Sequence, residues 1–330
     1  MAGQSSRKPF RFIVLGLILV ILIALGGSYA FRAKDEPKIL RVANQKASTK
    51  ALMVAAGVLK GAPYTVEWSE FPAAQSLLEA VGSGAADLGL AGDAPFIFAY
   101  QSGSPIKAVG ALDTASNPAE ALAVIVPSRS QIRAVNGLVG KRIATTRGSI
   151  GHHLLLQALE RSKIPADKVS MTFLPPGDAK AAFDSGAIDA WAIWTPFVTV
   201  AIQDGARVIV DARDFGLPVS FDVAHVPSIE PKKALMRDFM EREAKALEWG
   251  RAHPEAYAQV LAKDTGLPIE IARASLERNN RISVPLDRKI AEHEQVIADR
   301  FRAAGLIKAD RPLSEAFDPT VSALSQKKGS

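Results

Sequence analysis

The chain has 330 residues, a formal net charge of +6 at pH 7, a hydrophobic fraction of 48% and no cysteine. The absence of cysteine excludes a disulfide framework, a thiolate zinc site and a cysteine nucleophile. Three of the positive charges lie in residues 1–30, so the remaining chain carries +3 and lacks the dense Lys/Arg clusters of nucleic-acid-binding proteins. The length suits two domains of average size.

The N-terminal segment predicts export from the cytoplasm. The basic stretch RKPFR is followed by an uncharged apolar run over residues 12–30. This is the pattern of a secretory signal, and Ser28 and Ala30 place small residues where a signal peptidase cleaves. The run is also long enough to remain as a membrane anchor. Residues 1–30 are therefore predicted to be a signal peptide or an N-terminal anchor, with the rest of the protein in the periplasm or on the extracellular face.

Two segments of the remaining chain resemble each other. RVANQKAS at residues 41–48 matches RIATTRGS at residues 142–149, and SGAADLGLAGDAPF at residues 83–96 matches SGAIDAWAIWTPF at residues 185–197. Each unit alternates strands with helices, which predicts parallel sheets covered by helices on both faces. The repeat predicts an α/β protein with two Rossmann-like lobes, whose strands end at a shared ligand cleft.

The pattern of apolar residues gives the expected elements of each unit. In the first unit we expect strands at residues 40–43, 64–68 and 87–92 and helices at 49–59 and 73–81. In the second we expect strands at residues 142–145, 169–174 and 190–194 and helices at 152–161 and 178–184. Asp178 is predicted to cap its helix and Gly186 to end it.

Two apolar, proline-ended strands at residues 121–128 and 221–228 are predicted to cross between the lobes. Lobe I then comprises residues 38–127 and 226–320, lobe II comprises residues 128–225, and residues 321–330 form a disordered tail. The segment 229–305 is predicted to be helical, with Pro231 in a first turn and Gly266 and Gly305 at helix ends.

The stretch RGSIGHHLLLQALE at residues 147–160 allows three kinds of site. A serine-hydrolase elbow needs glycine two residues before and after the serine, but Arg147 occupies the first of these positions. A helical metal site favours ligands four residues apart, whereas His152 and His153 are adjacent. The third possibility is an anion site, in which Gly148 permits close backbone approach and Ser149 stands at a helix start.

Ser48 occupies the equivalent position in the first unit, and either serine could simply cap its helix. At the matched strand ends, Trp191 and Trp194 point to opposite faces, so one is expected to line the cleft, and Trp194 is nearer the strand's carboxyl end. In the first unit Gly92 and Asp93 stand at the carboxyl end of the strand, and Asp93 either caps the next helix or meets a ligand donor.

The blocks NQKAS, WSEFPAAQSLLEAVGSGAADLGLAGDAPFIFA, RGSIGHHLLLQALE and DAKAAFDSGAIDAWAIWTPF resemble the aliphatic-sulfonate-binding proteins of ABC importers. The wider group binds taurine, nitrate and thiamine precursors. The resemblance implies a type II periplasmic-binding-protein fold, a monomer that closes on a small organic anion, an ABC permease as partner, and no catalysis, cofactor, metal or nucleic acid. The predicted ligand-binding residues are Gln45, Ser48, Gly92, Asp93, Gly148, Ser149, His152, Trp191, Trp194 and Thr195.

The chain departs from the family pattern at four positions. Asn44 replaces an aromatic residue, Ile150 and Gly151 replace serines, and Thr195 replaces an acid. The missing acid argues against a ligand with an amino group, such as taurine. Nitrate and a pyrimidine precursor remain possible ligands. Two different functions also stay open. One is a desulfinase-like enzyme on the same fold, which would ordinarily use a cysteine, and the second is a membrane-anchored sensor or partner-binding module.

Overall fold

The computed structural model describes residues 38–322 and 324 except residues 47, 117 and 217, so the predicted signal or anchor segment lies outside the described residues. The described residues within 40–62 and 66–324 form one compact unit. Residues 38, 39 and 63–65 belong to a second unit, in which the Thr65 amide donates to the Lys38 carbonyl at 2.8 Å. Within the described chain, no helix is long and apolar enough to span a bilayer.

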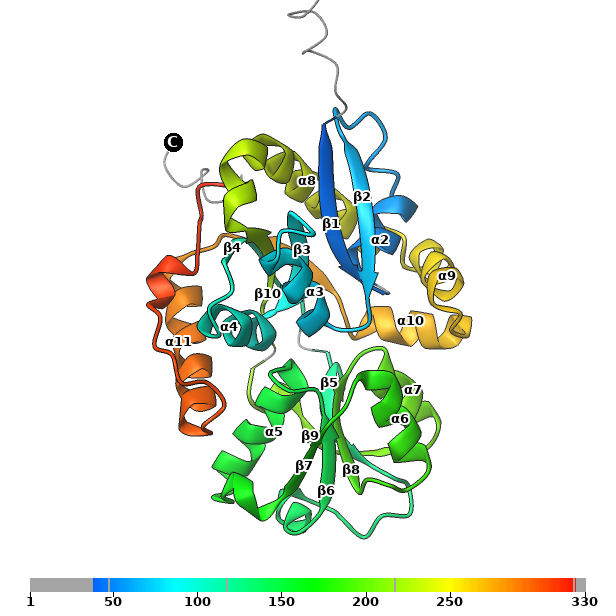
Figure 1. Ribbon diagram of the computed structural model, residues 1–330. Coiled ribbons are helices and arrows are strands. Elements are labelled where there is room, and N and C mark those ends of the chain that lie inside the picture. Colours follow the sequence, from blue (N-terminus) through cyan, green and yellow to red (C-terminus); the bar gives the residue numbers. More distant parts are fainter. Residues whose placement is uncertain (1–37, 47, 117, 217, 323, 325–330) are drawn as a thin grey trace, which may run out of the picture. The chain divides into compact units, whose positions relative to one another are not determined.

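The first sheet has six strands in the order β11-β4-β10-β3-β1-β2 (Figure 1). Strand β1 pairs in parallel with β3, while β10 runs antiparallel between β3 and β4, and β11 runs antiparallel to β4. The bounds are β1 (Ile39–Gln45), β2 (Thr65–Phe71), β3 (Leu88–Gly92), β4 (Ile106–Thr114), β10 (Ser220–His225) and β11 (Arg281–Val284).

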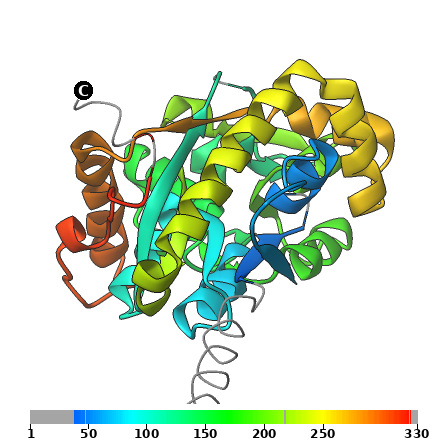
Figure 2. The ribbon, with the colours of Figure 1, turned by 90° about the horizontal axis from the view of Figure 1, so that it is seen from above.

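In the described chain, seven α-helices and one 3₁₀ helix belong to the part of the fold built on this sheet. The longest, α8, packs against β10, β4 and β11 and runs across the sheet in Figure 2. The bounds are α2 (Thr49–Ala55), α3 (Ala74–Gly82), α4 (Asp93–Gln101), α8 (Val226–Ala252), α9 (Pro254–Thr265), α10 (Ile269–Glu277), α11 (Arg288–Ala303) and the short 3₁₀ helix η4 (Leu313–Glu315).

The second sheet has the strand order β7-β6-β8-β5-β9, with α5 on one face and α6 and α7 on the other (Figure 1). Its strands are β5 (Leu122–Val126), β6 (Arg142–Thr145), β7 (Ser170–Phe173), β8 (Ala190–Trp194) and β9 (Arg207–Asp211). Its helices are α5 (Ile150–Arg161), α6 (Pro176–Asp184), α7 (Phe197–Gln203) and the 3₁₀ helices η1 (Val135–Leu138), η2 (Ala166–Lys168) and η3 (Ala212–Asp214).

The apolar run of β5 shows why this sheet is covered on both faces. Leu122, Val124 and Val126 pack in the cluster that contains the leucines of α5. The alternate residues Ala123 and Ile125 pack in a separate cluster with α6 and α7. Side chains alternate between faces along a strand, so an uninterrupted apolar strand requires a helical layer on each side.

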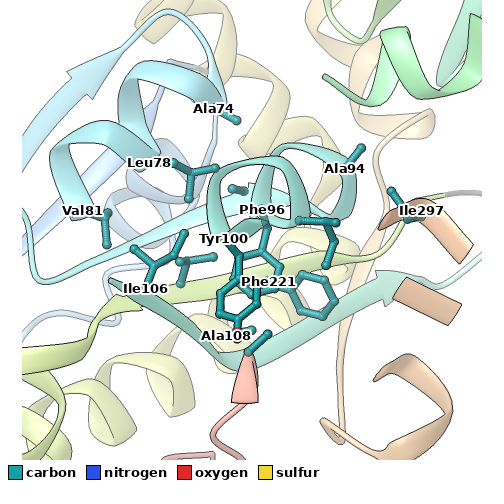
Figure 3. Close-up of a cluster of buried hydrophobic side chains, with 14 of the residues drawn as sticks. Ala74, Leu78, Val81, Ala94, Phe96, Tyr100, Ile106, Ala108, Phe221 and Ile297 are labelled. Carbon is teal, nitrogen blue, oxygen red and sulfur yellow. The ribbon is translucent and has the colours of Figure 1, made fainter. Parts of the chain in front are cut away.

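The main core of the first sheet lies beneath α3 and α4. Figure 3 shows Phe96 and Tyr100 of α4 beside Phe221 of β10, and the ring centroids of Phe96 and Phe221 are 5.3 Å apart. Ile297 of α11 belongs to the same buried cluster. This packing fixes the first turn of α4, and with it Gly92 and Asp93, against the end of β3.

The strand pairing corrects the predicted lobe boundaries at residues 127/128 and 225/226. Strand β5, predicted to end lobe I, pairs with β8 and β9 in the second sheet. Strand β10, predicted to end lobe II, pairs with β3 and β4 in the first sheet. Each crossing therefore precedes its strand, and both strands run antiparallel, so the sheets are mixed rather than parallel.

Four local predictions were also wrong. Helix α6 begins at Pro176, so Asp178 lies inside its first turn and is not the N-cap. Helix α8 begins at Val226, so Pro231 lies inside the helix, and Pro227 is the proline that occupies the first turn. The segment expected to be helical contains β11. The tail was predicted from residue 321, yet Val321 is buried and its carbonyl accepts from Arg237; residues 325–330 lie outside the described part.

Candidate functional site

A cavity of about 100 Å³ lies where the strand ends of the two sheets meet. Gln45, Gly92 and Thr114 are the last residues of β1, β3 and β4, and Trp194 is the last residue of β8. Antiparallel strands β5, β10 and β11 bring their first residues, Leu122, Ser220 and Arg281, to the same place. Ligands in open α/β sheets bind outside the carboxyl ends of the parallel strands, which is where this cavity lies.

Five predicted residues line this cavity together, and they come from both sheets. The first sheet contributes Gln45 and Gly92, and the second contributes Ser149, Trp194 and Thr195. Thr195 donates its hydroxyl to the Ala121 carbonyl at 3.2 Å.

The start of α5 is built by local sequence. Ser149 has the extended backbone of an N-cap, and its Oγ accepts from the His152 amide at 3.1 Å. Gly148 has φ +68°, and a Cβ at that position would lie 2.7 Å from the Phe98 ring. The amides of Ile150 and Gly151 belong to the first turn, where the helix itself offers no acceptor. This helix start therefore places the positive end of the helix dipole beside the cavity, which Ser149 and Ile150 line.

The two positions at which serine is replaced have a packing explanation. A Cβ on Gly151 would lie 2.6 Å from the Ala192 carbonyl oxygen, because α5 packs closely on β8. Ile150 packs in the apolar clusters beneath both sheets and also lines the cavity. These residues provide packing and backbone amides rather than hydroxyl groups.

Gly148, His152 and Trp191 do not line the cavity. Gly148 packs against Phe98, and Trp191 is fully buried between Phe183 and Phe197. His152 is buried, and its Nδ1 accepts from the Gly148 amide at 3.1 Å. Burial, followed by the nearby charge of Arg147, lowers the pKa of His152 to about 4, so this histidine is neutral and supports the loop.

Ser48 and Asp93 also lie elsewhere. Ser48 precedes α2, but within the described chain its hydroxyl accepts no capping bond, because Asn44 Oδ1 accepts from the Lys50 amide instead. Ser48 lines a separate cavity of about 360 Å³. Asp93 is buried, and its carboxylate accepts from the amides of Ala94 and Val219. Burial raises the pKa of Asp93 to about 7, although those two hydrogen bonds oppose the shift.

Sequence reasoning missed the contribution of the α10–β11 connection. Arg278, Asn279 and Arg281 line the cavity, and Asn279 and Arg281 also line the larger cavity beside Ser48. Helix was predicted here, although the Asn-Asn pair at residues 279–280 followed by the alternating RISV run is a turn-and-strand signal. Arg278 is held by Glu120 at 2.7 Å.

Arg281 is the cation that lines both cavities. Burial lowers the pKa of Arg281, while Tyr257, Glu243 and Asp222 oppose that shift. Burial raises the pKa values of Asp222 and Glu243, and Thr49 donates to Glu243 at 2.9 Å. The charge of Glu243 adds to burial in raising the pKa of Asp222, because two adjacent buried carboxyls disfavour each other's ionised form.

The site thus combines a cation, free helix-start amides and a tryptophan. A family model described as NMT1/THI5 like matches residues 65–257, which is more than half of the chain. The chain belongs to the NMT1/THI5-like family. This member is 33% identical over 292 residues to a protein of Escherichia coli (strain K12) named for binding aliphatic sulfonates, and the match covers 86% of this chain and 91% of that protein.

This NMT1/THI5-like protein is also similar in structure to solved sulfonate-binding proteins. The alkanesulfonate-binding protein of Xanthomonas axonopodis pv. citri, solved bound to MOPS, has a TM-score of 0.79 and 31% identity, covering 88% of this chain and 100% of that one. The periplasmic aliphatic sulphonate binding protein of Escherichia coli has a TM-score of 0.76 and 32% identity, covering 85% and 97%. The predicted periplasmic-binding fold is confirmed, and the chain is a substrate-binding protein rather than an enzyme.

Proposed function

We propose that this protein is the periplasmic solute-binding component of an ABC importer, that it captures an aliphatic sulfonate as a monomer, and that it delivers the ligand to a membrane permease. The observation that carries the proposal is the cavity at the meeting strand ends, where the α5 start and Arg281 supply donors and Trp194 supplies an apolar wall. The names of the relatives, and the binding of the sulfonate MOPS by one of them, support the same ligand class.

The head group determines which donors are useful. A sulfonate is ionised at every biological pH, so it needs donors for three oxygens and no proton acceptor. The free amides of Ile150 and Gly151 and the guanidinium of Arg281 are such donors, and hydrogen bonds to a charged group are stronger than neutral ones. Among the described residues that line the cavity, none has an acidic side chain, which disfavours a ligand with an ammonium group, such as taurine.

The tail determines the apolar side of the site. Trp194 lies at the end of β8, and Leu122 lies opposite it in the β5–β8 register. An indole buries a large apolar area and suits a short alkyl chain. We expect capture to proceed by closure of the two sheets about the crossings that precede β5 and β10, since hinges are short segments between rigid elements.

Calorimetric titration tests the proposal. The purified protein is unfolded and refolded to remove bound ligand, and then titrated with an alkanesulfonate, the carboxylate of equal chain length, MOPS, taurine and nitrate. We expect micromolar binding of the alkanesulfonate, equivalent to roughly −8 kcal/mol, and weaker binding of the others. Preference for taurine or nitrate would keep the importer role and replace the cargo. Absence of binding by all of them would contradict the proposal.

A further inference from the structure

Asp93, His293 and Glu294 form a cluster that the anion site does not use. Each offers one potential metal-ligand atom, and these atoms all lie within 4.8 Å of one another. Asp93 is the first residue of α4, whereas His293 and Glu294 are consecutive residues of α11. No metal site was predicted from histidine spacing or cysteine content, since Asp93 and His293 are 200 positions apart in the sequence.

The two helices that carry the cluster are held together by a packed core. Phe98 of α4 and Phe301 of α11 meet edge to face with centroids 5.8 Å apart. Ala94 and Ile297, which follow the cluster residues on the same helices, belong to one buried cluster and lie near each other in Figure 3. The positions of the three side chains are therefore set by rigid elements, as a specific metal site requires.

Glu294 is the observation that points to a bound cation. Its side chain is fully buried, and neither carboxylate oxygen has a hydrogen-bond partner among the residues that the structure describes. A buried carboxylate without partners costs several kcal/mol, and the neighbouring acid Asp93 increases that cost. A divalent cation between the two carboxyls would remove both penalties. Asp93 remains able to bind it, since a carboxylate has about four acceptor positions and the amides of Ala94 and Val219 use two.

Such a site would have room for a water molecule as a fourth ligand. A small cavity of about 20 Å³ is lined by Asp93 and His293, together with His153 and Gln157 of α5. That volume holds about one water. His293 is exposed, which leaves a path for the ion from solvent. His153 Nε2 lies 2.8 Å from Arg300 Nη1, so His153 is already engaged and is not counted as a ligand.

We propose that Asp93, His293 and Glu294 bind one divalent transition-metal ion, with zinc as the expected species. Two carboxylate oxygens, one imidazole nitrogen and one water give the four-coordinate arrangement that zinc accepts. Calcium and magnesium favour six or more oxygen ligands, and manganese binds mixed nitrogen and oxygen sites more weakly than zinc does. The site is separate from the anion cavity but adjoins it, because Asp93 directly follows Gly92.

The competing explanation for the unpartnered Glu294 carboxyl is that it carries a proton. Burial, followed by the nearby charge of Asp93, raises the pKa of Glu294 well above its usual range. Glu294 would then be a neutral acid with no metal, and its replacement by glutamine would change little except stability. Metal titration separates the two explanations, because only the first predicts a stoichiometric ligand.

The test uses the purified full chain after chelator treatment and dialysis. Titration with ZnCl₂ in a competing chelator is expected to show one site per chain, and thermal unfolding is expected to shift upward with ZnCl₂ and much less with MgCl₂ or CaCl₂. His293→Ala, which alters an exposed side chain, should weaken zinc binding at least tenfold. Glu294→Gln should do the same, while His253→Ala, at an exposed histidine elsewhere, should leave it unchanged.

X-ray absorption of the zinc-loaded protein should show a first shell of oxygen and nitrogen with a single imidazole. Zinc binding that survives His293→Ala and Glu294→Gln undiminished would overturn the proposal. So would the absence of a 1:1 site, and so would a Glu294→Gln variant that is more stable than the wild type whether zinc is present or absent.

Discussion

Arg41 donates to both carboxylate oxygens of Asp87, through Nε at 3.2 Å and Nη2 at 2.7 Å. Arg142 and Asp189 repeat this arrangement in the second sheet, at 3.1 Å and 3.0 Å, and in both pairs the arginine backbone amide also donates to the acid. The sequence repeat is thus a repeated structural unit, in which the first strand is tied to the turn that precedes the third.

The two copies differ in burial, and we expect them to differ in their effect on stability. The side chain of Asp87 is fully buried and also accepts from Lys232 and Ser228, whereas that of Asp189 is 32% exposed. Asp87→Ala should reduce the free energy of unfolding by about 3 kcal/mol, because it leaves buried donors without a partner. Asp189→Ala should cost clearly less, since solvent replaces the lost contact. Urea denaturation followed by fluorescence measures both, and equal losses would contradict this reasoning.

Asp87 should also make stability depend on acid pH. Burial alone would raise its pKa, but hydrogen bonds from Arg41, Lys232 and Ser228 outweigh burial and hold the pKa well below the usual range. The unfolded chain then binds a proton more readily than the folded one, so the stabilisation is present above about pH 4 and is lost as the pH falls below it. The urea midpoint should drop more steeply between pH 5 and pH 3 for the wild type than for Asp87→Asn. Parallel curves would show that other carboxyls are responsible.

Ser149→Ala should weaken sulfonate binding by about 1–3 kcal/mol and lower stability by about 1 kcal/mol, because Ser149 lines the cavity and its hydroxyl caps α5. Asp287→Ala is the matched control, since Asp287 caps α11 through the amides of Lys289 and Ile290. It should lower stability without changing affinity. Calorimetry and urea denaturation measure the two quantities. If both variants keep the wild-type affinity, Ser149 is a cap alone.

Trp194 and Trp191 should give opposite results in a chain-length series of alkanesulfonates. Trp194→Ala should weaken long ligands more than short ones, because Trp194 lines the cavity. Trp191→Ala should instead lower the free energy of unfolding by about 3–5 kcal/mol, since the ring is fully buried in the core. An equal affinity loss for every chain length in Trp194→Ala would place this side chain away from the ligand tail.

Arg281→Met should reduce affinity for the sulfonate by about 1.5–3 kcal/mol, the contribution of a hydrogen bond to a charged group. Arg278→Met, on the same cavity wall, should have a smaller effect because Glu120 already neutralises Arg278. The comparison is made by calorimetry at low and high salt. An Arg281 variant that binds as tightly as the wild type would assign the anion to the helix start alone.

Local sequence was sufficient to predict the features that depend on residues close together in the chain. Strands β6 and β8 have the predicted bounds, Ser149 caps α5 as its position indicates, and Gly186, Gly266 and Gly305 adopt positive φ at helix ends. Strand alternation placed Trp191 and Trp194 on opposite faces, and the position of Trp194 nearer the carboxyl end of the strand favoured it over Trp191, although both were predicted to bind ligand. The repeat and the family blocks likewise determined the fold class.

Tertiary structure decided the contacts between residues distant in sequence. The pairing of β5 and β10 is set by their neighbours in each sheet, and the pattern of a fully buried strand does not reveal its direction or its partner. Asn44, rather than Ser48, accepts the capping hydrogen bond at the start of α2. Arg281 lines the cavity from β11, within a segment that was predicted to be helical. Asp93 of α4 lies beside Glu294 of α11. Residue spacing along the chain does not predict these contacts, because they depend on how packed helices and strands orient their side chains.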